Sequence, residues 1–388
     1  MADLGHYVWS AVVGSGAYSL TRAGFYLVVS QQNLLVRFLF GALFGVLWLS
    51  LAGCVDVHTN VLRTDSSGGP LVSPDQLPLN SFQFYGSHNS YKTEIAPRVM
   101  QQLRSVNPAA ASGLDYWHEP LADQLDLGLR VLELDVFYDP EGRLFERGGT
   151  FPVLHVQTID TGSHCAFLAE CIDQINAWSE LNPGHEPLLI SFNAKTDAID
   201  QPGFVTPLEF DATAWQQLDA VLRQGFGAQI INPAEVLSPD GPYWPTLGAA
   251  REKVLLLLDE GPAKYEAYHN AVKRPALFAN IEPGNPRAAI QVINDPIADA
   301  ARIEHALQLG LLVRTRADAD TVEARAGDTA RREAAFASGA HFISTDYYRP
   351  SRHFGTDYVV ELPGGGSVRC NPKNLPRDAR ALCDDFSL

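Results

Sequence analysis

The chain has 388 residues, 46% of them hydrophobic, and its 29 basic and 45 acidic residues give a formal net charge of −16. The hydrophobic fraction is ordinary for a globular protein with a sizeable core. No basic stripe accompanies the acidic balance, so nucleic acid is excluded as the expected partner. Electrostatic adhesion to anionic lipid is excluded on the same ground, and attachment to a membrane needs another device.

The N-terminal region carries the pattern of an export signal. Arg37 precedes an apolar stretch, Phe38 to Leu51, which runs into Leu51-Ala52-Gly53-Cys54. A basic residue, a short apolar core and a small-residue cleavage site are typical of a secretory signal. The ending resembles the lipobox of bacterial lipoproteins, so we expect a signal peptide over residues 36–54 and lipidation of Cys54. A transmembrane anchor is the alternative, although the apolar run is short for a span.

These features predict an exported protein, lipid-anchored to a membrane of the bacterial cell envelope. Residues 1–35 fit no signal pattern, and a start at Val36 gives an ordinary signal peptide; residues 1–35 are therefore interpreted as a wrongly assigned start. Residues 55–79 are rich in Ser, Gly, Thr, Asp and Pro, which is typical of a flexible tether. A single catalytic domain is expected over residues 80–350, with a loop-rich extension over 351–388.

The cysteines agree with export. With Cys54 lipidated, four remain, and they form two pairs that are close in sequence: Cys165 with Cys171 and Cys370 with Cys383. In an oxidising compartment these pairs predict two disulfides. Zinc is the competing interpretation, but no Cys-x-x-Cys spacing is present.

From residue 80 onward, short apolar runs alternate with amphipathic segments. Strands are expected at Phe82–Tyr85, Arg130–Val136, Pro152–Val156, Leu188–Phe192, Val254–Leu258, Ala276–Ala279, Leu311–Arg314 and His341–Ser344. Helices are expected at Pro120–Leu127, Ala166–Glu180, Ala212–Arg223 and Ile297–Leu309, with Gly128 at a helix C-terminus. Strands that alternate with helices predict an α/β fold, a (β/α)8 TIM-type barrel. A doubly wound open sheet is the alternative, but no glycine-rich phosphate loop follows the first strand.

Polar residues gather where the first four expected strands end. They are His88, Asn89, Glu133, Asp135, His155, Asn193 and Lys195. In a TIM barrel the active site forms at these strand ends, and Glu133 and Asp135, two apart, point to one face. An acidic pair on a buried strand is costly unless it is paired or holds a cation. The oxygen-only set of Asn89, Glu133, Asp135 and Asn193 suits calcium or magnesium better than zinc.

The two histidines complete a constellation suited to phosphodiester cleavage. One imidazole can accept a proton from an attacking hydroxyl, and the other can donate one to the leaving oxygen. Lys195, Arg314 and Arg316 are candidates for contacting phosphate, with a strand-end salt bridge as the alternative. Tyr347 could stack on a sugar ring or pack as a rim aromatic. The remaining histidines considered, His118, His164, His185 and His353, are expected to be structural.

Several motifs resemble the calcium-dependent phosphoinositide phospholipase C family of bacteria, which is related to the X region of eukaryotic phospholipases C. They are Gly86–Tyr91, Tyr116–Leu121, Gln124-Leu125, Gly128–Asp135, Leu154–Val156, Leu189–Phe192, Val313–Asp318 and Phe342–Tyr347. The resemblance implies His88 as general base and His155 as general acid, with Asn89, Glu133 and Asp135 as calcium ligands. It also implies attack by the inositol 2-hydroxyl, which releases diacylglycerol and a cyclic phosphate.

One position departs from that family pattern. Asn193 stands where eukaryotic relatives place a glutamate that completes the calcium site, which leaves two formal negative charges among the ligands. Since calcium affinity falls with ligand charge, we expect weak binding that strengthens when the anionic substrate arrives.

Two other functions remain as alternatives. A glycerophosphodiester phosphodiesterase would use the same barrel, but such enzymes carry His-Arg-Gly where this chain has His88-Asn89-Ser90. A non-catalytic lipoprotein that binds inositol phosphates or glycans is motivated by Asn193, although such a protein needs no acid–base pair. The expected partners are a phospholipid or inositol phosphodiester substrate and a membrane reached through the lipid anchor, and the protein is expected to be a monomer.

Overall fold

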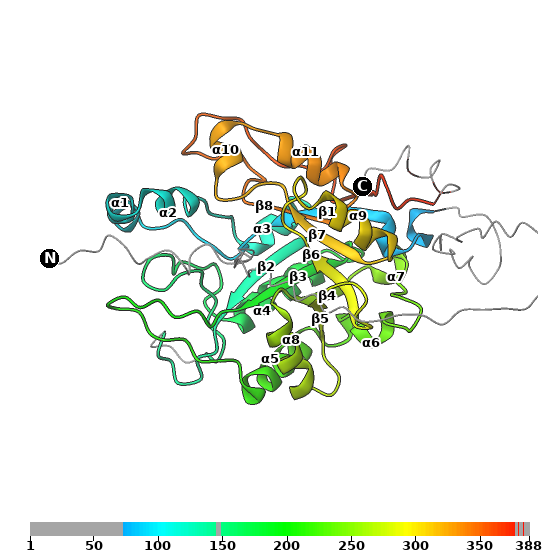
Figure 1. Ribbon diagram of the computed structural model, residues 1–388, viewed down its shortest axis with the longest axis horizontal. Coiled ribbons are helices and arrows are strands. Elements are labelled where there is room, and N and C mark those ends of the chain that lie inside the picture. The colour runs from blue at the N-terminus through cyan, green and yellow to red at the C-terminus, as the bar shows by residue number, and fades with distance from the viewer. Residues whose placement is uncertain (1–72, 145–148, 377–378, 380–382, 384–388) are drawn as a thin grey trace, which may run out of the picture. The chain divides into compact units, whose positions relative to one another are not determined.

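In the described part of the chain, eight parallel strands close into a barrel (Figure 1), and a ninth, short strand pairs antiparallel with the first of them. The computed structural model describes residues 73–144, 149–376, 379 and 383. The strands are β1 (Phe82–Ser87), β2 (Val131–Val136), β3 (Leu188–Ala194), β4 (Val254–Leu258), β5 (Leu277–Asn280), β6 (Ala288–Val292), β7 (Leu312–Arg316), β8 (Phe342–Thr345) and β9 (Val368–Cys370). The pairing runs in order from β2 to β8, then to β1, and β1 pairs back with β2. The expected TIM-type barrel is confirmed.

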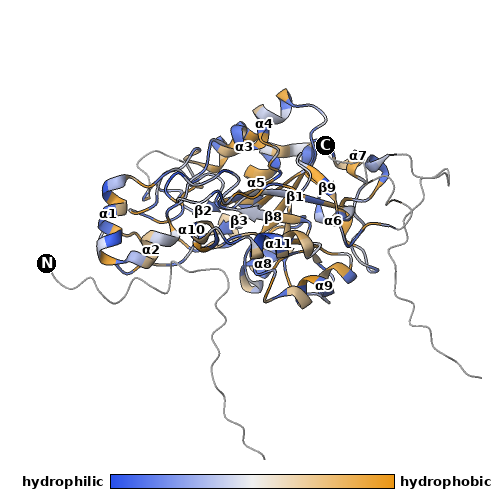
Figure 2. Cartoon of the chain, turned by 90° about the horizontal axis from the view of Figure 1, so that it is seen from above, coloured by the Kyte–Doolittle hydropathy of each residue, from blue (hydrophilic) through white to orange (hydrophobic). Residues whose placement is uncertain are grey.

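Helices surround this barrel. They are α1 (Pro97–Val106), α2 (Pro108–Gly113), α3 (Leu121–Asp126), α4 (Leu168–Leu181), α5 (Ala212–Phe226), α6 (Pro233–Val236), α7 (Leu247–Ala250), α8 (Pro262–Ala271), α9 (Ala300–Gln308), α10 (Val322–Ala326) and α11 (Ala330–Ala337). Many of them carry hydrophilic and hydrophobic residues on one element (Figure 2), as expected for helices with one buried side. None of the helices in the described part of the chain combines the length and apolar character needed to cross a bilayer.

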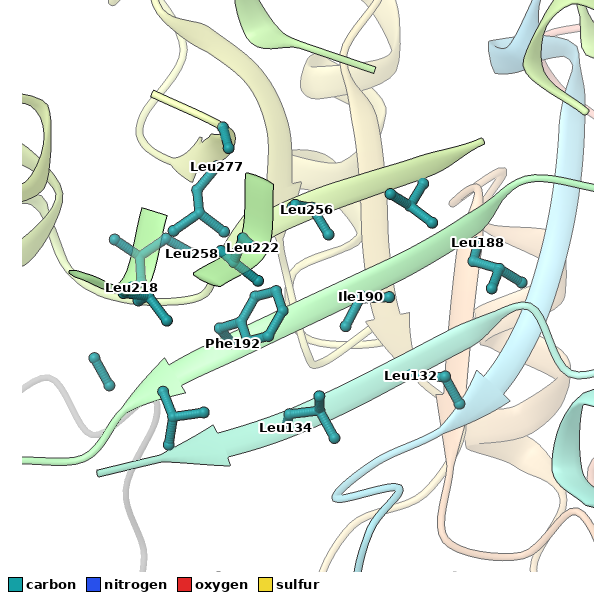
Figure 3. Close-up of a cluster of buried hydrophobic side chains, with 14 of the residues drawn as sticks. Leu132, Leu134, Leu188, Ile190, Phe192, Leu218, Leu222, Leu256, Leu258 and Leu277 are labelled. Carbon is teal, nitrogen blue, oxygen red and sulfur yellow. The ribbon is translucent and has the colours of Figure 1, made fainter. Parts of the chain in front are cut away.

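The alternation of side chains along β2 decides which residues face the site. Leu132 and Leu134 lie in the layer between the strands and the outer helices, together with Leu218 and Leu222 of α5 (Figure 3). Val131 belongs to the separate cluster with residues of β1, β3 and β4. Because successive strand residues point to opposite faces, Glu133 and Asp135 lie on the inner face. The expected orientation of the acidic pair is therefore confirmed by the two cores.

Two strand assignments from the sequence need correction. Pro152–Val156 is not a barrel strand: it forms only isolated antiparallel bridges, and β3 lies directly beside β2. The barrel instead recruits β6, Ala288–Val292, which the sequence did not reveal because its alanines and glutamine are poor strand formers. The expected number of barrel strands was right because these two errors compensate.

The ends of the domain also differ from expectation. Leu77 and Leu79 are fully buried, so the folded region begins before residue 80, within the segment expected to be a tether. The C-terminal extension contributes β9, which pairs antiparallel with β1. Both expected disulfides, Cys165–Cys171 and Cys370–Cys383, are present. The signal, Cys54 and the start at residue 36 lie outside the described residues.

Candidate active site

The turn after β1 sets the position of the first histidine. Asn89 adopts a left-handed backbone with φ of 48°, a conformation that asparagine tolerates better than most residues. This turn lets Ser90 Oγ accept from the backbone N–H of Glu133 at 2.9 Å, and Ser90 N donates to the Glu133 carbonyl at the same distance. The Ser-His-Asn-Ser sequence thus ties the end of β1 to the acidic strand β2.

Gly86, just before this turn, allows the barrel to close there. It is the β1 residue in register with Val131 of β2. A Cβ at Gly86 would lie 1.9 Å from the Val131 carbonyl oxygen, far inside any real contact. Only glycine permits this approach of the two backbones, and His88 leaves β1 two residues later.

His88 is oriented by a carboxylate from the other end of the sequence. Its Nδ1 lies 2.8 Å from Asp346 Oδ1, directly after β8, and Arg316 Nη2 donates to Asp346 Oδ2 at 2.8 Å. With Nδ1–H donated to Asp346, the lone pair of Nε2 faces the site, 3.3 Å from Arg316 Nη1 and 3.7 Å from Glu133 Oε1. Burial lowers the pKa of His88 well below 6.5, and the Arg316 charge lowers it further against the opposing effect of Glu133. The His88 ring is therefore neutral at pH 7.

His155 has the same kind of partner in a different setting. It lies on the loop between β2 and α4, not at the end of a barrel strand as expected, and its Nδ1 is 2.9 Å from Asp160 Oδ2. Backbone bonds between Val156 and Asp160 close a tight turn that brings this carboxylate back to the ring. The charge of His155 contributes to the lowered pKa of His88, so the two imidazoles interact electrostatically.

Tyr116 and Lys92 lie between the two histidine segments. The Tyr116 hydroxyl accepts from Asn89 Nδ2 at 2.8 Å and is 3.4 Å from His88 Nδ1. Lys92 is completely buried; its ammonium donates to the Tyr116 carbonyl at 2.6 Å and is 3.3 Å from Asp160 Oδ2. Burial lowers the pKa of Lys92, while the Asp160 carboxylate opposes that shift.

The two acids on β2 each have a cationic partner. Glu133 Oε2 accepts from Arg314 Nη2, and its Oε1 accepts from Asn193 Nδ2 at 3.0 Å. Asp135 Oδ2 is 3.2 Å from Lys195 Nζ, whereas Asp135 Oδ1 is buried without a hydrogen-bond partner. All the expected metal ligands and phosphate contacts thus come together at one end of the barrel.

Tyr347 lies away from this group. It is buried, and its ring packs against Phe354 and Tyr358 at centroid distances of 5.8 and 6.0 Å. Of the two interpretations offered by the sequence, Tyr347 therefore fits the packed aromatic, and its ring is not available for stacking on a substrate. The Nε2–H of His118 donates to the His88 carbonyl oxygen at 2.6 Å and therefore supports the backbone of the His88 turn.

Five further residues at the site were missed from the sequence. Asp346 and Asp160 orient the histidines, and Lys92 and Tyr116 join their segments. Asp259, at the end of β4, is a fifth: it lies 3.9 Å from Arg314 Nη1, and burial raises its pKa to about 6 against the effect of Arg314. The available signal was position, because Asp259 and Asp346 directly follow β4 and β8, as His88 directly follows β1.

The expected oxygen ligands fit a hard cation. The set offers two carboxylates and two amides, and the partnerless Asp135 Oδ1 is a buried oxygen of the kind that a cation satisfies. In the described part of the chain no three His, Cys, Asp or Glu side chains form a metal-holding group. The amides Asn89 and Asn193 would therefore have to supply the remaining ligands through Oδ1.

Comparison with known proteins identifies the family. The family model of Ca2+-dependent phosphoinositide phospholipase C matches residues 77–151 and 146–372. A calcium-dependent phosphoinositol-specific phospholipase C from a Gram-negative Pseudomonas species, solved with myoinositol, is 18% identical with a TM-score of 0.50, over 77% of this chain and 100% of its own.

A Ca2+-dependent phosphatidylinositol-specific phospholipase C from Streptomyces antibioticus is also 18% identical, with a TM-score of 0.44 over 70% of this chain and 95% of its own. No curated protein matches the chain. The family match covers most of the chain and agrees with the first of the functions expected from the sequence. This protein is therefore an enzyme of the Ca2+-dependent phosphoinositide phospholipase C family.

Proposed function

We propose that this enzyme cleaves the glycerol-side phosphodiester of phosphatidylinositol, with His88 as general base and His155 as general acid. The observation that carries the proposal is the pair of matched Asp–His contacts, 2.8 Å for His88 and 2.9 Å for His155. In both, Nδ1 is held by a carboxylate, so that Nε2 is left to exchange protons with a substrate. An attacking hydroxyl within the substrate itself needs no serine or cysteine nucleophile.

The steps follow from these roles. The inositol 2-hydroxyl gives its proton to His88 Nε2 as its oxygen forms the new bond to phosphorus. The bond between phosphorus and the glycerol oxygen breaks, and His155 Nε2 gives its proton to that oxygen. Diacylglycerol and an inositol 1,2-cyclic phosphate result, after which the two imidazoles return to their starting protonation through water.

Asn89, Glu133, Asp135 and Asn193 would hold the calcium ion, with magnesium as the other candidate. When bound, calcium supplies positive charge that neutralises the phosphate and lowers the pKa of the nucleophile. Arg314 and Arg316 are each paired with an acid, at Glu133 and Asp346 respectively. They therefore orient the two acids, and Arg316 also adds positive charge beside the His88 ring.

The test is turnover of phosphatidylinositol in vesicles, followed by phosphorus NMR of the products. His88→Ala and His155→Ala should each reduce turnover about a hundredfold or more, while calcium removal should abolish it. His305→Ala, an exposed histidine on α9, is the control and should match the parent. Full activity in either active-site variant would refute the assigned roles.

Substrate access is proposed to come from the lipid anchor. The lipobox-like sequence ending at Cys54 supports a lipoprotein held at a membrane of the cell envelope, where the substrate lies. Metabolic labelling with a radioactive fatty acid should mark the parent protein and leave Cys54→Ala unlabelled. Equal labelling of both proteins would remove the anchor from this proposal.

A further inference from the structure

The two cations that pair with the acids of β2 are held differently. Arg314 has a side chain only 2% exposed and contacts Glu133, Asn294 and Asp259. Lys195 lies just beyond β3, its side chain is 30% exposed, and its ion pair joins it to Asp135 at 3.2 Å. Arg314 is therefore fixed among several partners, whereas Lys195 is partly exposed and pairs directly with Asp135, with Glu260 and Glu133 acting on its charge less strongly than Asp135.

Asp135 is unevenly satisfied. One carboxylate oxygen contacts the lysine ammonium, and the other, Oδ1, is buried without a well-formed hydrogen bond, although the neutral Tyr91 hydroxyl interacts with the carboxylate. A desolvated carboxylate oxygen without a strong donor is costly. The single positive charge of Lys195 thus neutralises Asp135 but leaves room for a stronger cationic partner.

We propose that Lys195 is a displaceable counter-ion of the calcium site. In the absence of calcium its ammonium neutralises Asp135; when calcium and substrate bind together, Lys195 leaves Asp135 and contacts the scissile phosphate. This inference rests on the proposed calcium site. It makes the binding of the metal and of the anionic substrate interdependent, because each takes over one member of the Lys195–Asp135 pair.

Linkage fixes the expected sign. Calcium and Lys195 compete for Asp135, so substrate-free calcium binding is weakened by the lysine. A phosphate that attracts Lys195 removes the competitor, and by reciprocity calcium strengthens phosphate binding by the same factor. Competition from Lys195 weakens calcium binding further, beyond the weak binding already expected because Asn193 is a neutral ligand.

The experiment is calorimetric titration of calcium into the parent, Lys195→Met and Lys195→Gln, each with and without inositol 1-phosphate. In the parent, the phosphate should tighten calcium binding about tenfold. In Lys195→Met, substrate-free calcium should bind about tenfold more tightly than in the parent, and the added phosphate should then change the affinity less than threefold. Lys195→Gln can still donate to Asp135 but has no charge, so it should bind calcium more tightly than the parent as well.

Lys264 provides a matched control. It is another lysine at the same rim, 28% exposed, and its ammonium pairs with Glu260 at 3.1 Å. Glu260 is not one of the expected calcium ligands, so Lys264→Met should leave the calcium affinity within threefold of the parent. Thermal unfolding of each variant checks folding, and Lys195→Gln decides the question if Lys195→Met does not fold.

The outcomes separate the two proposals. If the parent binds calcium and both Lys195 variants bind it with the same or lower affinity, the counter-ion role is overturned and the proposed function still stands. An equal gain of affinity in Lys264→Met would also overturn it, because any nearby charge would then suffice. No calcium binding by any variant, with or without the phosphate, would overturn the calcium site itself.

Discussion

The two histidine segments contain the same chemistry on two different supports. In each, an aspartate contacts the imidazole Nδ1 and also a cation: Asp346 joins His88 to Arg316, and Asp160 joins His155 to Lys92. His88 is held by barrel strands, with its aspartate 258 positions away. His155 is held by a tight turn on a loop, with its aspartate five positions away.

The difference shows what each half of the site depends on. The His88 half is correct only when β8 lies beside β1 and the barrel is closed. The His155 half depends on local anchors: the Cys165–Cys171 disulfide, the bond from His164 N to the Tyr91 carbonyl, and the buried Lys92. Substituting the aspartate of either His–Asp pair should therefore reduce activity to the same extent. A change in the barrel strands or in the loop should affect the two pairs differently.

The largest expected effect tests the chemical equivalence. Asp346→Asn and Asp160→Asn each replace the carboxyl group that contacts the imidazole Nδ1 by an amide, so the ring is less well fixed in the required tautomer. Each should reduce kcat about a hundredfold with a smaller change in KM, measured on phosphatidylinositol vesicles at saturating calcium. A loss in one variant alone would show that the two dyads are not equivalent.

The next effect tests the supports, through the two disulfides. Replacing Cys165 and Cys171 by serine should lower the free energy of unfolding by about 2 kcal/mol and reduce kcat about tenfold, because the loop that carries His155 loses its anchor. Denaturant unfolding and steady-state kinetics measure the two quantities.

The control is the pair Cys370 and Cys383, which closes a longer segment beside β9. Their replacement by serine should cost about 3 kcal/mol of stability with kcat within twofold of the parent. Equal losses of kcat in the two double variants would mean that general destabilisation, and not the His155 loop, explains the effect.

The smallest expected effect is on the pH dependence of kcat/KM, and it involves only His88 and its neighbours. The pKa of His88 is lowered well below 6.5 by burial and next by Arg316. A base must be unprotonated, so kcat/KM should fall only as the pH falls through this lowered pKa, at values below 6.5. Removing the guanidinium in Arg316→Met should move that acid limb upward, toward 6.5.

The pH profile of kcat/KM measures this shift. Arg302→Met, which removes an exposed arginine of α9, should leave the limb where it is. An acid limb that moves downward in Arg316→Met would contradict the assignment of this limb to His88.

The sequence was sufficient for the parts of the site that depend on strand periodicity. Glu133 and Asp135 could be placed on the inner face because residues two apart on a strand share a side, and His88 followed from its position after β1. It was insufficient for His155, since an apolar run such as Pro152–Val156 resembles a strand whether or not neighbouring strands pair with it.

The partners of the site residues were the larger omission. Asp346 and Asp160 act by contacting the imidazoles of His88 and His155. Barrel closure brings Asp346 to His88, and a tight turn brings Asp160 to His155. Lys92 is completely buried, which composition alone would not suggest for a lysine. The roles of these residues could not be predicted because they depend on which side chains the fold brings into contact, and not on residue type.

The separation of His88 from Asp346 has a consequence for synthesis. While the chain is still growing, both imidazoles and both β2 acids can already exist before the last barrel strand has been made. Until β8 and Asp346 have been made, however, the barrel cannot close and His88 has no orienting carboxylate, so the growing polypeptide should be unable to cleave lipid. Competence arrives at the end of translation, so a premature stop anywhere before residue 346 should yield an inert fragment and not a partially active one.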